Sequence, residues 1–244
     1  MKRAKPLVSV IIPCYRSGAF LENTVQGILR VFSPACPYDL QLILVDDCSP
    51  DDTGAVIRRL AAADKRILGI GLAKNAGQAG ARTAAYPFIR GNFAVFMDDD
   101  GQHPADLIPS LIRKAEEGYH LVYASFPVLK ESRARRAASA VNNLFMTILL
   151  RKPLSLRITS LFALDEKAVR AIRTRPRSAL FIGGYLLPRT KHVCTVPAGQ
   201  LARQEGKSGY TLRKLLRHWR ALVRCRFWRG PETPAAEIAW TTGR

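Results

Sequence analysis

The stretch Phe96-Met97-Asp98-Asp99-Asp100-Gly101-Gln102-His103-Pro104 joins an apolar run to three consecutive carboxylates. Residues 92 to 97 are typical of a buried strand, and Pro104 can open a helix. The acids are therefore expected at the carboxyl end of a strand, where open α/β sheets bind ligands. Three like charges repel unless they share a cation, and oxygen ligands at this density suit Mg²⁺ or Mn²⁺. The alternative is a solvated acidic turn that caps a helix.

The rest of the chain repeats this strand–loop–helix pattern. Short apolar runs are expected as strands, and segments with apolar residues at helical spacing as the helices between them. The strands are expected at 7–13, 40–45, 66–72, 92–97 and 120–125, and the helices at 20–32, 53–62, from 74 onward and 104–117. A further strand, which returns toward the site, is expected at 160–164. This alternation predicts an α/β fold with a mostly parallel sheet and right-handed crossovers. Polar residues after the strands should then meet at one edge: Tyr15, Asp46, Asp47, Asn75, Gly77, Arg82 and Asp98–Gln102.

The charge of the chain points to anionic partners. Lys and Arg number 38 against 19 Asp and Glu, which gives a formal charge of +19. No helix-turn-helix, zinc-site spacing or aromatic RNA platform is evident, so nucleic acid is not expected. Residues 210–229 have apolar and basic faces at helical spacing, which predicts a helix on an anionic membrane surface. Residues 230–244 are expected to be a disordered tail.

The sequence also bears on the cellular compartment. Five cysteines show no paired spacing, which favours a reducing cytosol. No signal peptide and no transmembrane-length apolar run is recognisable. We therefore expect a cytoplasmic protein, peripheral at the inner face of the membrane. The sequence leaves its oligomeric state open.

Four segments match a known family in order and spacing: Val8–Tyr15, Val45–Thr53, Asn75–Arg82 and Met97–Pro104. They resemble the family 2 inverting glycosyltransferases of GT-A fold, in particular the dolichol- and undecaprenyl-phosphate sugar transferases. Residues 203–211 are similar to a further segment of that subgroup. The resemblance implies a GT-A domain over residues 1–209, a nucleotide-sugar donor and a divalent cation, Mg²⁺ or Mn²⁺.

The resemblance also implies roles for individual residues. Tyr15 is expected to stack on the base and Asp47 to accept its imide N–H, with Asp98 near the ribose. Asp100 and Gln102 are the expected metal ligands. The expected nucleotide-sugar-binding residues are Pro13, Tyr15, Asp47, Gly77, Arg82 and Asp98, and the expected catalytic residues are Asp98, Asp100 and Arg203. Arg82 has two expected partners, a phosphate or Asp98. We expect Asp99 to point to solvent and His103 to lie in the first turn of a helix.

The acceptor is less defined than the donor. A lipid phosphate is already an anionic nucleophile, so it needs cations rather than a general base. Arg133, Arg135 and Arg136 lie where the family has a basic, membrane-facing helix and are the expected acceptor-binding residues. No Glu-Asp or Glu-Thr-Asp pair stands between Ser125 and Ser160, which favours a polyprenyl phosphate over a saccharide hydroxyl.

Two alternatives stay open. The segment Ser160-Leu161-Phe162-Ala163 lacks the Arg of the Phe-Arg element that many lipid-phosphate transferases carry. One alternative is therefore transfer to a saccharide hydroxyl in cell-envelope polysaccharide synthesis. The other is a catalytically weak, membrane-binding scaffold of the same fold.

Overall fold

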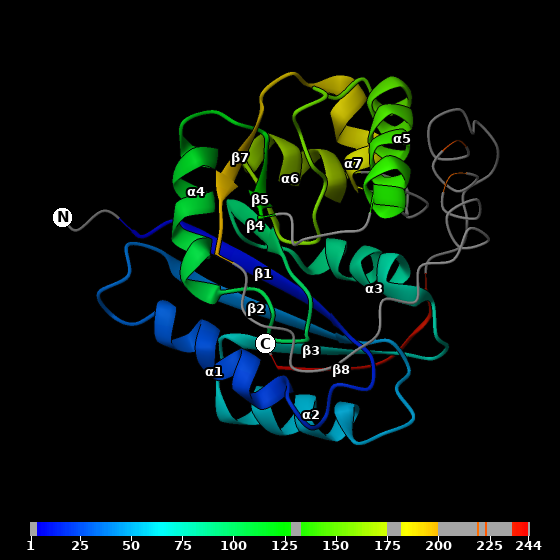
Figure 1. The fold of residues 1–244 in the computed structure, drawn as a ribbon. Coiled ribbons are helices and arrows are strands. Elements are labelled where there is room, and N and C mark those ends of the chain that lie inside the picture. The colour runs from blue at the N-terminus through cyan, green and yellow to red at the C-terminus, as the bar shows by residue number, and fades with distance from the viewer. Residues whose placement is uncertain are drawn as a thin grey trace.

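Strands and helices alternate along the chain, with the helices packed on both faces of one sheet (Figure 1). The computed structural model describes residues 4–127, 133–174, 182–199, 219, 223 and 236–243, with side chains in the helix that begins at residue 133 described from residue 139. The strands are β1 Leu7–Cys14, β2 Asp39–Asp46, β3 Ile67–Leu72, β4 Phe93–Phe96, β5 Leu121–Ser125, β6 Phe162–Leu164, β7 Val193–Pro197 and β8 Ile238–Thr242. The α-helices are α1 Leu21–Val31, α2 Thr53–Ala63, α3 Gly77–Ala85, α4 Ile108–Glu116, α5 Arg133–Leu150, α6 Glu166–Arg173 and α7 Ile182–Leu186. Short 3₁₀ helices span Tyr86–Phe88, Ala105–Leu107 and Leu187–Arg189.

The sheet of the described residues has the order β7-β5-β6-β4-β1-β2-β3-β8. Its centre is parallel: β1 pairs with β2 and β4, and β2 pairs with β3. Cys14 at the end of β1 lies beside Asp46 at the end of β2. The carboxyl ends of β1 to β4 therefore share one edge, as the alternation of strand and helix predicts.

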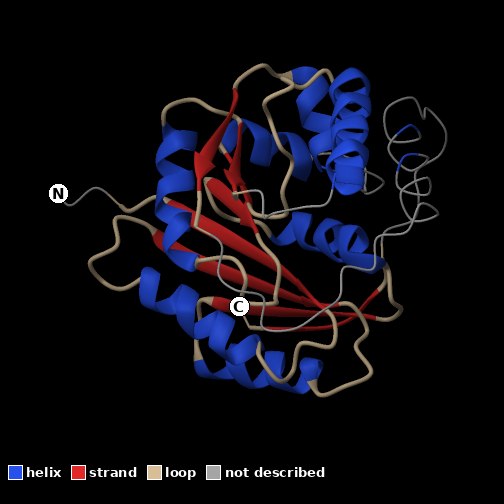
Figure 2. Ribbon diagram, viewed as in Figure 1, coloured by secondary structure: helices blue, strands red, loops and turns tan. Residues whose placement is uncertain are grey.

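Apolar residues cover both faces of the sheet. The central strands read as nearly continuous buried runs, because helices pack on either side of them. One core lies between the sheet and α1, α2 and α4, and the other lies against α3, α5, α6 and α7 (Figure 2). No helix within the described residues is both long and apolar enough to cross a bilayer.

Strand β6 is short and antiparallel, and it lies between β4 and β5. The sequence predicts a returning strand at residues 160–164, and the structure forms it at Phe162–Leu164. One backbone hydrogen bond, from Ala124 N–H to the Leu161 carbonyl oxygen, continues the pairing toward the carboxyl edge. Residues 159 and 160 are thereby brought to the edge where β4 and β5 end.

The expected disordered tail at 230–244 is wrong for residues 238–242, which form β8 antiparallel to β3. The Trp240 ring lies over Gly69 and Gly71 of β3, and a Cβ at Gly71 would come within 2.0 Å of its atoms. The Arg58 guanidinium from α2 lies 4.7 Å from the ring centroid. The sheet thus extends past the domain boundary expected at residue 209. The sequence misses this strand because its packing partners are glycines about 170 residues earlier.

Candidate active site

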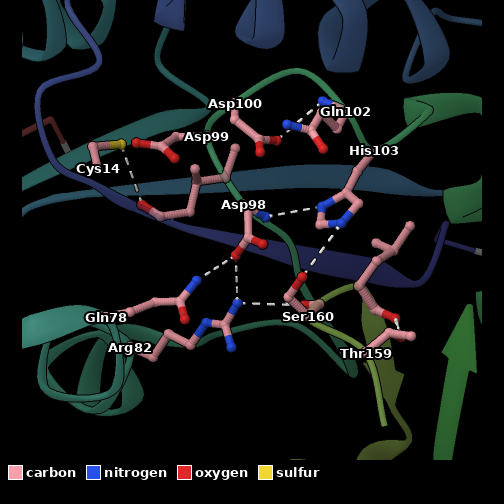
Figure 3. A network of polar contacts seen from close by, with 12 residues as sticks. Cys14, Gln78, Arg82, Asp98, Asp99, Asp100, Gln102, His103, Thr159 and Ser160 are labelled. Carbon is pink, nitrogen blue, oxygen red and sulfur yellow. Dashed lines mark hydrogen bonds and ion pairs between the residues drawn. The ribbon is translucent and has the colours of Figure 1, made fainter. Parts of the chain in front are cut away.

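Asp98 begins the loop after β4 and is held by an ion pair. Its Oδ1 accepts from the Arg82 Nη2 at 2.9 Å and from the Gln78 side chain (Figure 3). Only 14% of the Arg82 side chain is exposed, and burial lowers its pKa while the Asp98 charge opposes that shift. Asp98, one of the two partners expected for Arg82, is its partner in the structure, and the expected phosphate contact stays a prediction. The pair leaves Arg82 Nε buried without a hydrogen-bond partner among the described residues.

Asp99 turns toward the loop after β1. Its Oδ2 accepts from the Tyr15 backbone N–H at 3.2 Å and from the Ser17 hydroxyl. Burial raises the pKa of Asp99, although both hydrogen bonds stabilise the charged form. The expectation that Asp99 points to solvent is therefore wrong, because the β1 loop folds against it.

Asp100 and Gln102 have oxygen atoms that suit a hard cation. The Asp100 Oδ1 accepts from the Gln102 backbone N–H at 3.1 Å, and Gly101 between them has φ +68°. Among the described residues, no group of three or more His, Cys, Asp or Glu could hold a metal by itself. Asp98 and Asp99 each have side-chain partners, whereas the described contact of the Asp100 carboxylate is the one backbone N–H of Gln102. Asp100 and Gln102 fit a cation whose remaining ligands come from substrate oxygens or water.

Asp47 connects the loop after β2 to the start of α3. It is buried, and its Oδ1 accepts from the Ala76 N–H at 2.6 Å. The Asn75 side chain donates to the Asp47 carbonyl at 3.1 Å. Burial raises the pKa of Asp47, while the N–H groups of Ala76 and Gly77 oppose that shift. Gly77 opens α3 with φ +72°, a conformation that glycine adopts without strain.

A pocket of about 360 Å³ lies where these loops meet. It is lined by Pro13, Cys14, Tyr15, Asp47, Asn75, Gly77, Gln78 and Asp99. Tyr15 is 45% exposed at this pocket. Four of the six expected nucleotide-sugar-binding residues line the pocket; the other two, Arg82 and Asp98, adjoin it through Gln78. Its size is in the range of small-molecule sites.

Sequence reasoning missed three contributors to this site. Gln78 stands one helical turn before Arg82, and this i, i+4 spacing could have predicted that both reach Asp98. His103 precedes the 3₁₀ helix that begins at residue 105, so its expected place in a helical turn is wrong. It instead accepts the Asp98 backbone N–H through Nδ1 and contacts Ser160 Oγ through Nε2. No local pattern indicates the Ser160 contact, which depends on where β6 returns.

Other expected residues are not part of the described site. Arg203 and nearly all of residues 210–229 lie outside the described residues. Arg133, Arg135 and Arg136 stand in the first turn of α5, whose side chains are not among those described. Their roles stay predictions.

Comparison with known proteins supports the interpretation of these motifs. Residues 9–173 match the model of the family described as glycosyl transferase family 2. The undecaprenyl-phosphate 4-deoxy-4-formamido-L-arabinose transferase of Edwardsiella ictaluri is 28% identical over 222 residues, 89% of this chain and 67% of that protein. The transferase of the same name from Shewanella sediminis is 28% identical over 210 residues, 86% of this chain and 63% of that protein. The chain thus spans about two thirds of the length of these relatives.

Solved structures share the fold. Glucosyl-3-phosphoglycerate synthase from Mycobacterium tuberculosis, in complex with Mn²⁺, UDP-glucose and phosphoglyceric acid, superimposes with a TM-score of 0.65. That comparison covers 98% of this chain and 89% of the synthase at 16% identity, so it establishes the fold alone. The family match covers more than half of the chain and includes the loops after β1 to β4. The chain therefore belongs to glycosyl transferase family 2, with the GT-A fold, and is a glycosyltransferase.

Proposed function

We propose that the chain transfers a sugar, with inversion, from a nucleoside-diphosphate donor to the phosphate of a polyprenyl lipid. The observation that carries the donor half is the pocket between Tyr15, Asp47 and Gly77, with the acidic loop beside it. A nucleotide needs an aromatic surface for its base, donors for its phosphates and a cation for its leaving charge. An exposed aromatic ring, a helix amino end and acidic side chains that could hold a cation all lie at this edge of the sheet.

Different residues at this pocket would contact or support different parts of the donor. Tyr15 has an exposed ring that can stack on a base, and Asp47 fixes the loop that leads into α3. The amino end of α3 at Gly77 lines the pocket and carries a partial positive charge. Arg82 holds Asp98 in place, so that the free edge of that carboxylate is available to ribose hydroxyls.

A divalent cation, Mg²⁺ or Mn²⁺, would be held by Asp100 and Gln102. When bound, it would neutralise negative charge that develops on the departing diphosphate. The Mn²⁺ bound with UDP in a structural neighbour supports a divalent cation. The choice of Asp100 and Gln102 rests on the sequence resemblance and on the contacts of the acidic loop. We name only Asp100 and Gln102 as ligands because Asp98 and Asp99 already have side-chain partners among the described residues.

The acceptor half of the proposal rests on the relatives and on the sequence between β5 and β6. Both relatives compared above are named for transfer to undecaprenyl phosphate. A phosphate anion attacks without a general base, and residues 126–160 contain only one acidic residue, Glu131. The arginines at 133, 135 and 136 would hold the phosphate, and Arg203 the diphosphate.

A donor screen tests the first half. We expect Mn²⁺ with one family of nucleoside diphosphates, among UDP, GDP and TDP and their sugars, to raise the melting temperature. At a ligand concentration about 100 times the Kd, binding adds about 2.7 kcal/mol to the free energy of unfolding. The measurement is thermal unfolding with and without Mn²⁺ for each nucleotide. A melting temperature that no nucleotide changes would refute the proposed donor site, and transfer to a saccharide but not to undecaprenyl phosphate would refute the acceptor.

The membrane is the proposed partner that brings the acceptor to the site. Helix α5 exposes Val141, Leu144 and Ile148, the last of them 72% exposed, on a chain with a large positive charge. We expect the protein to co-sediment with vesicles that contain anionic lipid at low salt and to be partly released at high salt. Neutral vesicles are the control. Absence of binding to anionic vesicles at low salt would contradict peripheral placement at the membrane.

A further inference from the structure

His103 is bound at both ring nitrogens. Its Nδ1 accepts the backbone N–H of Asp98 at 3.1 Å, and its Nε2 lies 3.3 Å from Ser160 Oγ (Figure 3). Because Nδ1 is an acceptor in this arrangement, the ring proton belongs on Nε2, which then donates to Ser160. The side chain of His103 thus joins the end of the loop 98–103 to its first residue, Asp98, and in this sense closes the loop.

These contacts form a closed ring of four residues. Arg82 pairs with Asp98 at 2.9 Å, and the same nitrogen lies 3.4 Å from the Ser160 carbonyl oxygen. Ser160 in turn contacts His103, which holds Asp98. The ring joins α3, the end of β4 and the start of β6 (Figure 3). The acidic loop is therefore connected to the segment that returns from α5.

Both ends of the connection are fixed by the surrounding structure. The His103 ring stacks on Phe126, just after β5, with centroids 5.7 Å apart. On the other side, Thr159 Oγ1 donates to the Ala124 carbonyl oxygen at 2.9 Å or to that of Leu161 at 3.0 Å. The imidazole cannot swing away without losing this stacking. The loop that contains Asp100 and Gln102 is thus closed by a side chain that is itself immobilised.

We propose that His103 is a positioning residue, which sets the conformation of loop 98–102 so that Asp100 and Gln102 can hold a divalent cation. The inference rests on the proposed function, because it takes the cation site from there. Outer contacts of this kind typically change metal affinity 10- to 100-fold when they are removed. The bond to Asp98 N–H is the one that closes the loop, and the bond to Ser160 orients the ring.

Two variants separate the two bonds. His103→Asn places an amide oxygen near the position of Nδ1 and keeps an acceptor for Asp98 N–H. His103→Gln reaches the position of Nε2 and keeps only the Ser160 contact. We expect the Mn²⁺ concentration at half-maximal transfer to rise about 10-fold or more for His103→Gln, and to change less than about 3-fold for His103→Asn. We expect the same ranking of the two variants, with His103→Gln the more impaired, when Mn²⁺-dependent UDP binding is measured by calorimetry.

Ser160→Ala tests the second bond. In the wild-type chain, Ser160→Ala should change the Mn²⁺ concentration at half-maximal transfer only slightly. In His103→Asn it should cause no further change, because the contact with Ser160 is already lost. His192→Asn is a matched control, because that histidine is exposed and contacts His120 rather than the site. Equal metal dependence in His103→Gln and wild type would overturn the proposal.

A readout without turnover keeps this test separate from the proposed function. In ¹⁵N spectra of the wild-type imidazole, we expect the neutral tautomer of His103 with its proton on Nε2. A proton on Nδ1 would overturn the proposal, since Nδ1 could not then accept from Asp98. Wild-type protein that binds no nucleotide would refute the proposed function instead, while the tautomer still reports whether His103 closes the loop.

Discussion

Replacing Asp100 by Asn is expected to reduce metal-dependent sugar transfer by about 10²- to 10³-fold, which corresponds to about 3 to 4 kcal/mol of transition-state stabilisation. Asp98 is paired with Arg82, and Asp99 is bound by Ser17 and Tyr15. Asp100 is the member of the triplet whose described hydrogen bond comes only from the neighbouring Gln102 N–H. Its carboxylate is thus the one with the fewest described hydrogen bonds, and we propose it as the ligand of the cation. Initial rates measured over a range of Mn²⁺ concentrations test this expectation.

Asp106→Asn is the matched control for that experiment. Asp106 lies in the 3₁₀ helix directly after the acidic loop and is exposed, so its substitution removes one charge at a similar place in the chain. We expect it to stay within about 3-fold of the wild-type rate, since charges exposed to water are strongly screened. Full metal-dependent activity in Asp100→Asn would refute Asp100 as a ligand.

The second large effect is expected from Gly71→Ala. A Cβ at this position would lie 2.0 Å from two atoms of the Trp240 ring, so β8 must shift or detach. Overpacking of this kind costs about 1 to 3 kcal/mol. Ala73 N–H pairs with the Glu237 carbonyl oxygen at 2.8 Å, just before the loop that carries Asn75 and Gly77. A detached β8 should therefore also weaken nucleotide binding.

Urea unfolding and nucleotide binding measure both consequences. Gly71→Ala combined with Trp240→Ala should be more stable than the sum of the two single changes predicts, because the double variant removes the collision. Gly27→Ala is the control: a Cβ there meets no atom within 4 Å, and alanine in α1 should stabilise by about 0.5 to 1 kcal/mol. Wild-type stability in Gly71→Ala would contradict the packing of Trp240.

Local sequence predicted most of the first half of the fold. Each central strand is a nearly continuous apolar run, and each following helix has apolar residues at helical spacing, so the elements from β1 to β5 could be assigned without tertiary contacts. Parallel pairing then places the loops after β1 to β4 at one edge. Pro13, Tyr15, Asp47 and Gly77 line one pocket for this reason.

The individual roles of the polar residues could not be predicted in this way. Identical carboxylates in one triplet differ because Arg82 reaches Asp98 from α3 and Ser17 reaches Asp99 from the β1 loop. The contact between His103 and Ser160 joins residues 57 positions apart. Such contacts depend on which loops pack together, and no local pattern of residues encodes that.

The sequence by itself thus determined the family, the alternation of elements and the edge at which the site forms, because periodicity and motif spacing are local properties. Only the tertiary structure decided which partners the three acids have, how His103 contacts the start of the acidic loop and that residues 238–242 complete the sheet. These outcomes depend on burial and on distances between segments remote in the chain. Gly69 and Gly71 leave room for the Trp240 ring, and this role appears only when β8 lies beside β3.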